Sequence, residues 1–247
     1  MKLLLQSDWQ ADNMTAPVKQ AVQQLRWKGD EKIRKEEFSL AVISNSSLEL
    51  YKDYTPIGTV EFVRTFAEKI GVKLPAPIHA TELLQLEGRK CFVVHSPKLQ
   101  KLQAKDYPVF VKPLTELKKF TGFVAKSDKD FDLYPEIDWD NTKLFVTEVL
   151  ENIVSEWRCY VLNGKVFACV NYAGDPLKFP NSAAIRNCID NFESAPIAYS
   201  LDMAITDHTQ FIEINDAYAL GYYGGDVELY TKMLNERWKE IITSQKI

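Results

Sequence analysis

Apolar and polar positions over the first hundred residues follow two alternating periods. Short apolar runs predict buried strands at Lys2–Gln6, 40–43 and Cys91–Val94. Between them, stripes of helical period with proline, glycine or capping signals at their ends predict helices over 17–27 and 59–70. Strands that alternate with helices in this way favour a small α/β domain with a mainly parallel sheet.

From Tyr107 onward the pattern changes to longer strands of antiparallel type. A helix is expected there over 227–242, with Asp226 in the capping position. The predicted elements are strands over 108–112, up to 124 and over 143–150, hairpins within 156–171 and 200–215, and helices over 183–192 and 227–242.

The polar segment 96–106 is the expected linker between these two patterns. We therefore predict the fold class α/β (α+β), with two domains. Residues 1–105 would form the N-terminal α/β domain, and residues 106–247 a second domain with antiparallel sheets.

The clearest local signal is the Asn-Gly pair at 163–164, which lies between two alternating runs and predicts a type I′ hairpin turn. With this turn, Arg158 is expected opposite Cys169 and Glu156 opposite Asn171, so Glu156, Arg158 and Asn171 share one face. Two interpretations stay open. A surface Glu–Arg pair contributes at most about 1 kcal/mol, whereas an arginine oriented by polar neighbours is a clamp for phosphate or carboxylate.

The hairpin over 200–215 carries two carboxylates. If its turn centres on Asp207 and His208, Asp202 lies directly opposite Glu213, and Asn215 shares their face. Like charges in this position destabilise a sheet unless a cation neutralises them, and carboxylate and amide oxygens suit Mg²⁺. The alternative is a pair of carboxylates solvated at an exposed sheet face. The opposite face is expected in the core and carries Leu201, Met203, Ile205, Ile212 and Ile214.

Lys112 closes the apolar strand 108–112, directly before a proline. A lysine in this position either extends its stem along the sheet edge to reach water or faces an anion. The strand alone does not decide between the two.

The composition excludes some classes of partner. The chain has 247 residues, of which 46% are hydrophobic and 26% charged, as in a globular protein with a sizeable core. Its net charge is −4 and basic and acidic residues are interleaved, so we expect no nucleic-acid partner. No apolar run approaches the roughly 20 residues of a membrane span, and the first residues do not resemble a signal peptide. We therefore expect a cytoplasmic protein with no membrane partner.

The four cysteines agree with that compartment. They have no CxxC spacing and lie in apolar runs, which is typical of reduced core residues. Two of them can come close across the first predicted hairpin. These two are Cys159 and Cys169, and the other two cysteines are Cys91 and Cys188.

The order of the motifs is more specific than any one of them. The series runs VFVKP at 109–113, KKFTGFV at 118–124, VTEVLE at 146–151, SEWRCYVLNGKV at 155–166, YSLDMA at 199–204 and FIEINDAYALGYYG at 211–224. It resembles the ATP-grasp superfamily, and most of all the branch named for two conserved arginines and a lysine, over about residues 107–225.

The resemblance implies ATP and Mg²⁺ as cofactors and a role for each motif. Lys112 would contact the nucleotide phosphates, and Arg158 the transferred phosphoryl group or the substrate carboxylate, with Arg186 as a second catalytic candidate. The remaining nucleotide-site candidates are Lys119, Glu148, Val149, Leu150 and Glu156, and the Mg²⁺ ligands are Asp202, Glu213 and Asn215.

The function expected from the resemblance is ATP-dependent ligation of a carboxylate to an amine or thiol through an acyl phosphate, releasing ADP and phosphate. The substrates would be small molecules or peptides. Two alternatives are a kinase that phosphorylates a hydroxyl group and a module that binds ATP without turning it over.

Overall fold

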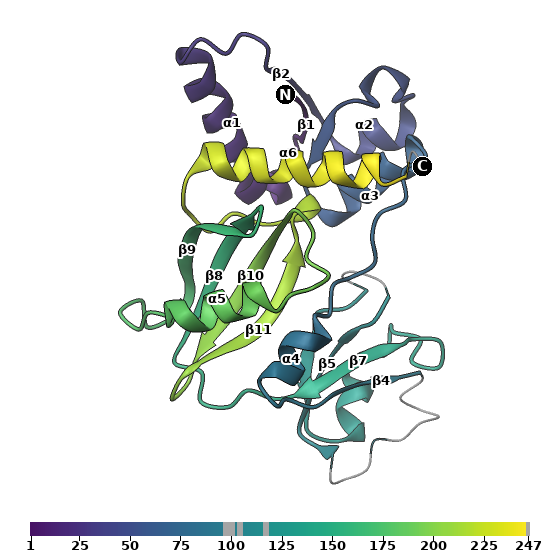
Figure 1. Cartoon of the computed structure of the whole chain (residues 1–247). Coiled ribbons are helices and arrows are strands. Elements are labelled where there is room, and N and C mark those ends of the chain that lie inside the picture. Colours follow the sequence, from purple (N-terminus) through teal and green to yellow (C-terminus); the bar gives the residue numbers. More distant parts are fainter. Residues whose placement is uncertain (96–101, 103–105, 116–118, 246–247) are drawn as a thin grey trace.

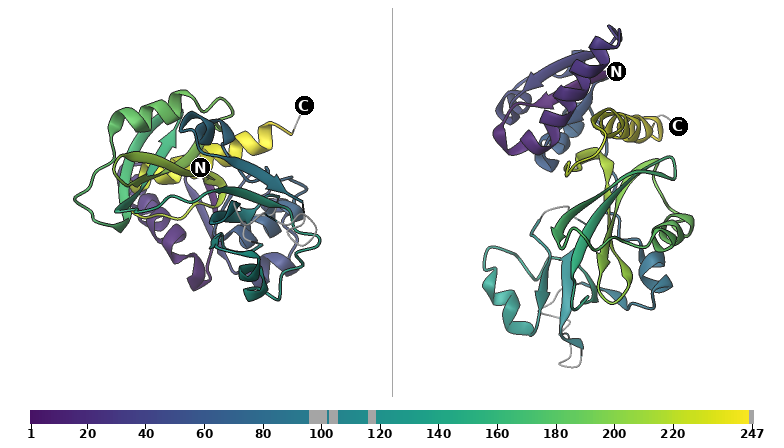
Figure 2. Two further views of the ribbon diagram at one scale, coloured as in Figure 1. Left: turned by 90° about the horizontal axis from the view of Figure 1, so that it is seen from below. Right: turned by 90° about the vertical axis from the view of Figure 1, so that its left-hand side faces the viewer.

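The computed structural model describes residues 1–95, 102, 106–115 and 119–245, which form three sheets (Figure 1). The predicted linker 96–106 lies outside the described residues, except for Leu102 and Asp106. The right-hand view of Figure 2 shows the three sheets following one another along the molecule. Within the described ranges, no helix is long and apolar enough to cross a membrane.

The N-terminal sheet is parallel, as predicted, and has the strand order β2-β1-β3. It consists of β1 (Lys2–Gln6), β2 (Arg34–Phe38) and β3 (Thr55–Ile57), with the helices α1 (Asp12–Trp27), α2 (Leu40–Asn45) and α3 (Val60–Lys69). The helices predicted over 17–27 and 59–70 are confirmed as parts of α1 and α3.

Residues 40–43 form a helix and not the predicted strand. The side chain of Ser39 accepts a hydrogen bond from the amide of Val42, and the Asp8 carboxylate accepts one from the amide of Leu40 at 2.7 Å. Both oxygens satisfy backbone donors that the first turn of a helix leaves unpaired. An apolar run this short does not by its periodicity distinguish a buried helix from a strand.

The central sheet is antiparallel, with the strand order β11-β10-β8-β9. One face is covered by α5, whose Ile185 packs in a core with Leu201 and Met203. At the β8–β9 turn, Asn163 and Gly164 have φ angles of 53° and 68°, as the predicted type I′ turn requires. The elements are β8 (Ser155–Leu162), β9 (Lys165–Gly174), α5 (Ser182–Asp190), β10 (Ala198–Ile205) and β11 (Thr209–Asp216).

The outer sheet is also antiparallel, with the order β4-β7-β5-β6. Strand β4 was expected in the N-terminal sheet, but it pairs with β7, with Cys91 opposite Thr147. A short apolar run carries no signal for which strand it pairs with. The elements are α4 (Thr81–Leu86), β4 (Cys91–Val94), β5 (Val109–Pro113), β6 (Phe123–Ala125) and β7 (Leu144–Glu148), and short 3₁₀ helices occur at Trp9–Ala11, Glu49–Tyr51, Asp128–Leu133 and Ala217–Ala219.

The last helix, α6 (Val227–Thr243), returns to the N-terminal sheet and lies between it and the central sheet (Figure 1). Asp226 caps its N-terminus, as predicted. Trp238 packs on Phe66 of α3, with 5.9 Å between the ring centroids, and joins a core with Leu4 and Phe62. The two ends of the chain therefore share one core.

Trp238→Ala should lower the free energy of unfolding by about 3–5 kcal/mol, because it removes a 2% exposed side chain from this core. Trp27→Ala is the matched control, since Trp27 is 84% exposed and its loss should change stability by less than about 0.5 kcal/mol. Urea unfolding followed by far-UV circular dichroism measures both variants. Equal losses would contradict the packing of α6 on the first sheet.

Candidate active site

Strand β11 carries a bulge beside the two predicted carboxylates. Asp202 pairs with Glu213, as predicted. The turn, however, is centred on Asp207 alone, with Ile205 opposite Thr209, and Met203 pairs with Phe211. Ile212 is therefore the extra residue on β11. The bulge turns Ile212 out of the core predicted for it and into a cavity that Glu213 also lines.

Arg158 and Asp202 form a buried ion pair between β8 and β10. Nε of Arg158 donates to Oδ1 of Asp202 at 2.9 Å and Nη2 donates to Oδ2 at 2.7 Å, and the side chains are 9% and 2% exposed. Burial raises the pKa of Asp202 to about 6, although the hydrogen bonds and the charge of Arg158 act in the opposite direction. The Tyr223 ring lies 4.7 Å from Cζ of Arg158, a cation–π contact. The guanidinium group is thus held in one orientation.

The register predicted for Arg158 is wrong by one residue, because the β8–β9 register shifts between Tyr160 and Val161, on the turn side of Arg158. Arg158 pairs with Val170, and Cys159 pairs with Cys169. The sulfur atoms of these free cysteines lie 2.7 Å apart, which confirms their predicted proximity.

The same shift removes Asn171 from the face on which it was predicted. Asn171 pairs with Trp157, and its amide donates to the backbone oxygen of Glu156 at 3.1 Å. The side chain of Glu156 accepts instead from the hydroxyl of Tyr172 at 2.8 Å. Tyr172 therefore takes the place beside Glu156 that the sequence predicted for Asn171.

Lys112 faces an anion and does not extend along the sheet edge. Its Nζ lies 3.4 Å from Oε2 of Glu213. The Asn215 amide donates to Glu213 at 3.0 Å and to Asp202 at 3.2 Å. Lys112, Glu213, Asn215, Asp202 and Arg158 thus form one continuous polar network between the outer and the central sheet.

The oxygen atoms of this network fit a magnesium ion, although the described residues contain no group of three or more His, Cys, Asp or Glu side chains that could hold a metal. Glu213 and Asn215 line a cavity of about 680 Å³ and have the oxygen donors that a hard cation takes. Asp202 gives both oxygens to Arg158. Mg²⁺ commonly takes only one or two carboxylates and completes its shell with water and phosphate oxygens. Glu213 and Asn215 are therefore the better candidates, and Asp202 orients Arg158.

Two cavities meet at the network. The inter-sheet cavity, of about 350 Å³, lies between the outer and central sheets and is lined by Phe110, Phe145, Ile212 and the backbone stretch 148–150. The central cavity, of about 680 Å³, reaches from Arg158 and Asn215 to α1 and α3 of the N-terminal part. The predicted residues Lys112, Glu148, Val149, Leu150 and Glu156 line the inter-sheet cavity, and Lys112, Arg158, Glu213 and Asn215 line the central one.

His79 is a member of the site that the sequence analysis missed. Together with Lys112 and Glu213 it lines both cavities. Its Nε2 lies 2.8 Å from the carbonyl oxygen of Leu114, and its ring stacks on Phe145 at 4.3 Å between centroids. Burial lowers the pKa of His79, so the imidazole is neutral at pH 7. A lone histidine after a proline-rich stretch carries no periodic signal by which it could have been found.

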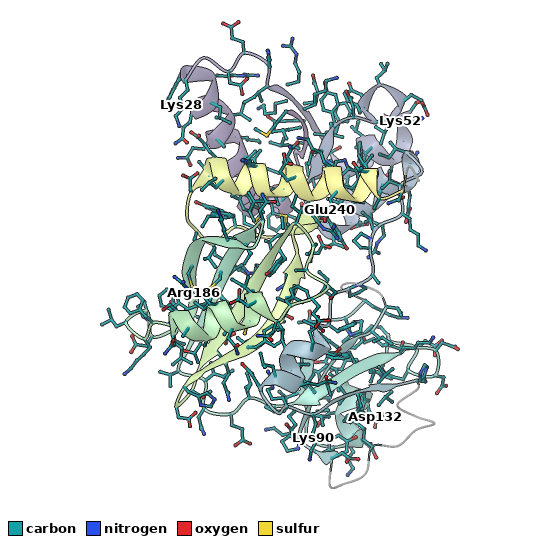
Figure 3. The ribbon with its side chains drawn as sticks, in the orientation of Figure 1. Lys28, Lys52, Lys90, Asp132, Arg186 and Glu240 are labelled. Carbon is teal, nitrogen blue, oxygen red and sulfur yellow. The ribbon has the colours of Figure 1, made fainter. Side chains whose placement is uncertain are left out.

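Two candidates are not brought to the network. Arg186 lies on the exposed side of α5 (Figure 3) and lines neither cavity. The core side of α5 packs on Leu201 and Met203, whose side chains lie on the sheet face opposite to Asp202. Lys119 is exposed and also lines neither cavity, although its neighbours Phe120 and Thr121 line the central one.

Comparison with solved structures shows a shared fold. The ADP complex of purK, N5-carboxyaminoimidazole ribonucleotide synthetase, superposes with a TM-score of 0.58 at 12% identity, over 95% of this chain and 76% of that chain. D-alanine–D-alanine ligase from Bacillus anthracis complexed with ATP superposes with a TM-score of 0.55 at 13% identity, over 100% of this chain and 99% of that chain. The macrocyclase MdnC from Microcystis aeruginosa MRC, bound to the precursor peptide MdnA, has a TM-score of 0.52 at 13% identity. The match covers 98% of this chain and 100% of that chain.

Sequence comparison identifies the family. No curated protein matches the chain significantly. The family model described as "ATP-grasp domain, R2K clade family 2" matches residues 88–233, more than half of the chain. The matched range contains both antiparallel sheets, the five-residue network and most of the walls of the inter-sheet cavity. The chain therefore belongs to the ATP-grasp domain, R2K clade family 2.

Proposed function

We propose that this ATP-grasp enzyme is a ligase that joins a carboxylate to an amine or thiol through an acyl phosphate, with release of ADP and phosphate. The observation that carries the proposal is the position of the five-residue network at the junction of the two cavities. One cavity suits a nucleotide base, and the other contains the cations and the space that a carboxylate substrate needs.

The inter-sheet cavity supports nucleotide binding. Its Phe and Ile side chains offer flat apolar contact for a base, and the backbone of 148–150 offers hydrogen-bonding groups at its edge. Lys112, at the inner end, would bind phosphate oxygens as a point charge. We further propose that Lys112 and Arg158 are the lysine and one arginine of the branch named for two arginines and a lysine.

The central cavity supports binding of the substrate carboxylate. Asp202 accepts from Nε and Nη2 of Arg158, and Arg158 also lines this cavity. The ligand would therefore bind at Nη1. A fixed guanidinium group stabilises charge that develops on the transferred phosphoryl group or on the oxyanion, because it does not have to reorient during the reaction. Mg²⁺ held by Glu213 and Asn215 would supply positive charge to the phosphate oxygens. The substrates, small molecules or peptides, would enter from the side of α1 and α3.

Glu213→Gln should fold and lose at least about 100-fold in turnover, because an amide cannot replace a carboxylate that binds the metal. Removing one of two facing carboxylates should leave the stability without nucleotide unchanged or slightly higher. Thermal melts with and without Mg-ATP, together with rates of ADP formation, measure both effects. Glu193→Gln, at an exposed position, is the control. Wild-type turnover and full stabilisation by Mg-ATP in Glu213→Gln would contradict the assignment.

Lys112→Ala and Arg158→Lys should affect different steps. Lys112→Ala removes a charge that contacts ATP before reaction, so the dissociation constant for ATP should rise. Arg158→Lys keeps the charge and loses the planar fork, so turnover should fall more than ATP affinity. Isothermal titration with ATP and steady-state rates separate the two. Equal changes in ATP affinity with turnover otherwise intact would argue against this division of roles.

The nucleotide product should be ADP. Incubation with ATP, pooled amino acids or peptides, and hydroxylamine should give hydroxamates together with ADP and phosphate, because hydroxylamine attacks an acyl phosphate. Mass spectrometry and nucleotide chromatography detect both products. AMP with pyrophosphate would indicate adenylation, and a stable phosphate ester with ADP would indicate a kinase.

A further inference from the structure

The segment 87–90, between α4 and β4, connects the outer sheet to the central sheet. Toward the outer sheet, the amide of Lys90 donates to Oε2 of Glu148 at 3.0 Å, and the amide of Glu148 donates to the carbonyl of Lys90 at 3.1 Å. Toward the central sheet, Oε1 of Glu87 accepts from the amide of Phe211 at 2.6 Å, and Nη1 of Arg89 donates to the carbonyl of Phe211. Nη2 of Arg89 also lies 3.4 Å from the carbonyl oxygen of Glu148.

The contact on Phe211 is made at the β11 bulge. Strand β11 is an edge strand, and the register shift comes directly after Phe211. Buried backbone donors and acceptors must be satisfied, and at Phe211 the side chains of Glu87 and Arg89 do this in place of a neighbouring strand. The next two residues are Ile212 and Glu213, which both face the inter-sheet cavity.

Stability alone does not explain the choice of a charged pair here. The side chains of Glu87 and Arg89 are 19% and 11% exposed and approach each other only to 3.9 Å. Burial raises the pKa of Glu87 and lowers that of Arg89. Among the described residues, Oε2 of Glu87 and Nε of Arg89 have no hydrogen-bond partner. Incompletely satisfied buried charges contribute little net stability compared with apolar side chains of the same size.

We propose that Glu87 and Arg89 are positioning residues that hold the β11 bulge at a fixed distance from the backbone of 148–150. A bound nucleotide would place its base against 148–150 at one end of the inter-sheet cavity and its phosphates near Glu213 at the other end. This clamp, formed by the contacts of Glu87 and Arg89 with Phe211 and of Arg89 with Glu148, thus sets the distance between the two ends of the cavity. This inference rests on the proposed nucleotide site, and on the assignment of Glu213 to the metal.

Arg89→Met is the first test, since it removes the contacts to Phe211 and Glu148 together. The dissociation constant for Mg-ATP, and the Mg²⁺ concentration that gives half of the thermal stabilisation by ATP, should each rise about 10-fold or more, as for residues that orient metal ligands. Arg89→Lys keeps the charge and one contact, so it should show the same changes at a smaller size. If Arg89→Met does not fold, Arg89→Lys alone tests the proposal.

Lys90→Met is the matched control. It changes the net charge by the same amount in the same segment, but its side chain, labelled in Figure 3, is 84% exposed. Its backbone contact to Glu148 remains. It should bind Mg-ATP like the unmodified protein. Adding Arg89→Met to Glu213→Gln should change Mg²⁺ dependence little further, because residues that act through one another are not additive.

Three outcomes would overturn the inference. If Arg89→Met and Arg89→Lys lose stability but keep the Mg-ATP affinity and the Mg²⁺ dependence, the clamp is structural only. If Arg89→Met and Glu213→Gln are fully additive, Arg89 does not act through Glu213. If the unmodified protein binds no Mg-ATP, the proposed function fails as well. The binding measurements need only ATP and Mg²⁺, and no carboxylate or amine substrate. They therefore still test the inference if the protein binds ATP but is not a ligase.

Discussion

The buried charge of Asp202 constrains the rest of the site. A carboxylate without solvent requires a cation in every state of the protein, and removing one partner of a buried ion pair typically costs about 3–5 kcal/mol. Arg158 is therefore a fixed part of the structure. Lys112 and Glu213 are different, since their side chains are more exposed and their charged atoms are 3.4 Å apart. In the proposed reaction, phosphates could draw Lys112 away from Glu213 without disturbing Arg158.

Local signals in the sequence predicted the parts of the site that depend on local structure. The Asn-Gly turn, the cap at Asp226 and the pairing of Asp202 with Glu213 are all present. The turn and the cap follow from residues near one another in the chain. Asp202 meets Glu213 for another reason, since the extra residue Ile212 offsets a turn that is centred on Asp207 alone. The order of motifs then identified the superfamily, because six segments in one order are far more specific than any one of them.

The features that the sequence did not predict depend on contacts between distant segments. The bulges in β9 and β11 each shift the register by one residue, and the pattern of apolar residues does not reveal them, as the position of Ile212 shows. His79 and Arg89 lie in connecting segments without periodicity, and only the three-dimensional fold brings them to the cavities. Arg186 is a candidate through the family resemblance alone, and the core packing of α5 lies on the sheet face opposite to Asp202.

The position of α6 has a consequence for the order in which the chain folds during synthesis. Trp238 and Ile241 belong to the same core as Leu4 and Phe62, so the N-terminal layer cannot be completed until α6 has left the ribosome. Domains usually fold in the order in which they are made. Here the apolar face of β1 and α3 must wait while both antiparallel sheets are synthesised. Until then it presents the kind of exposed apolar surface that chaperones bind.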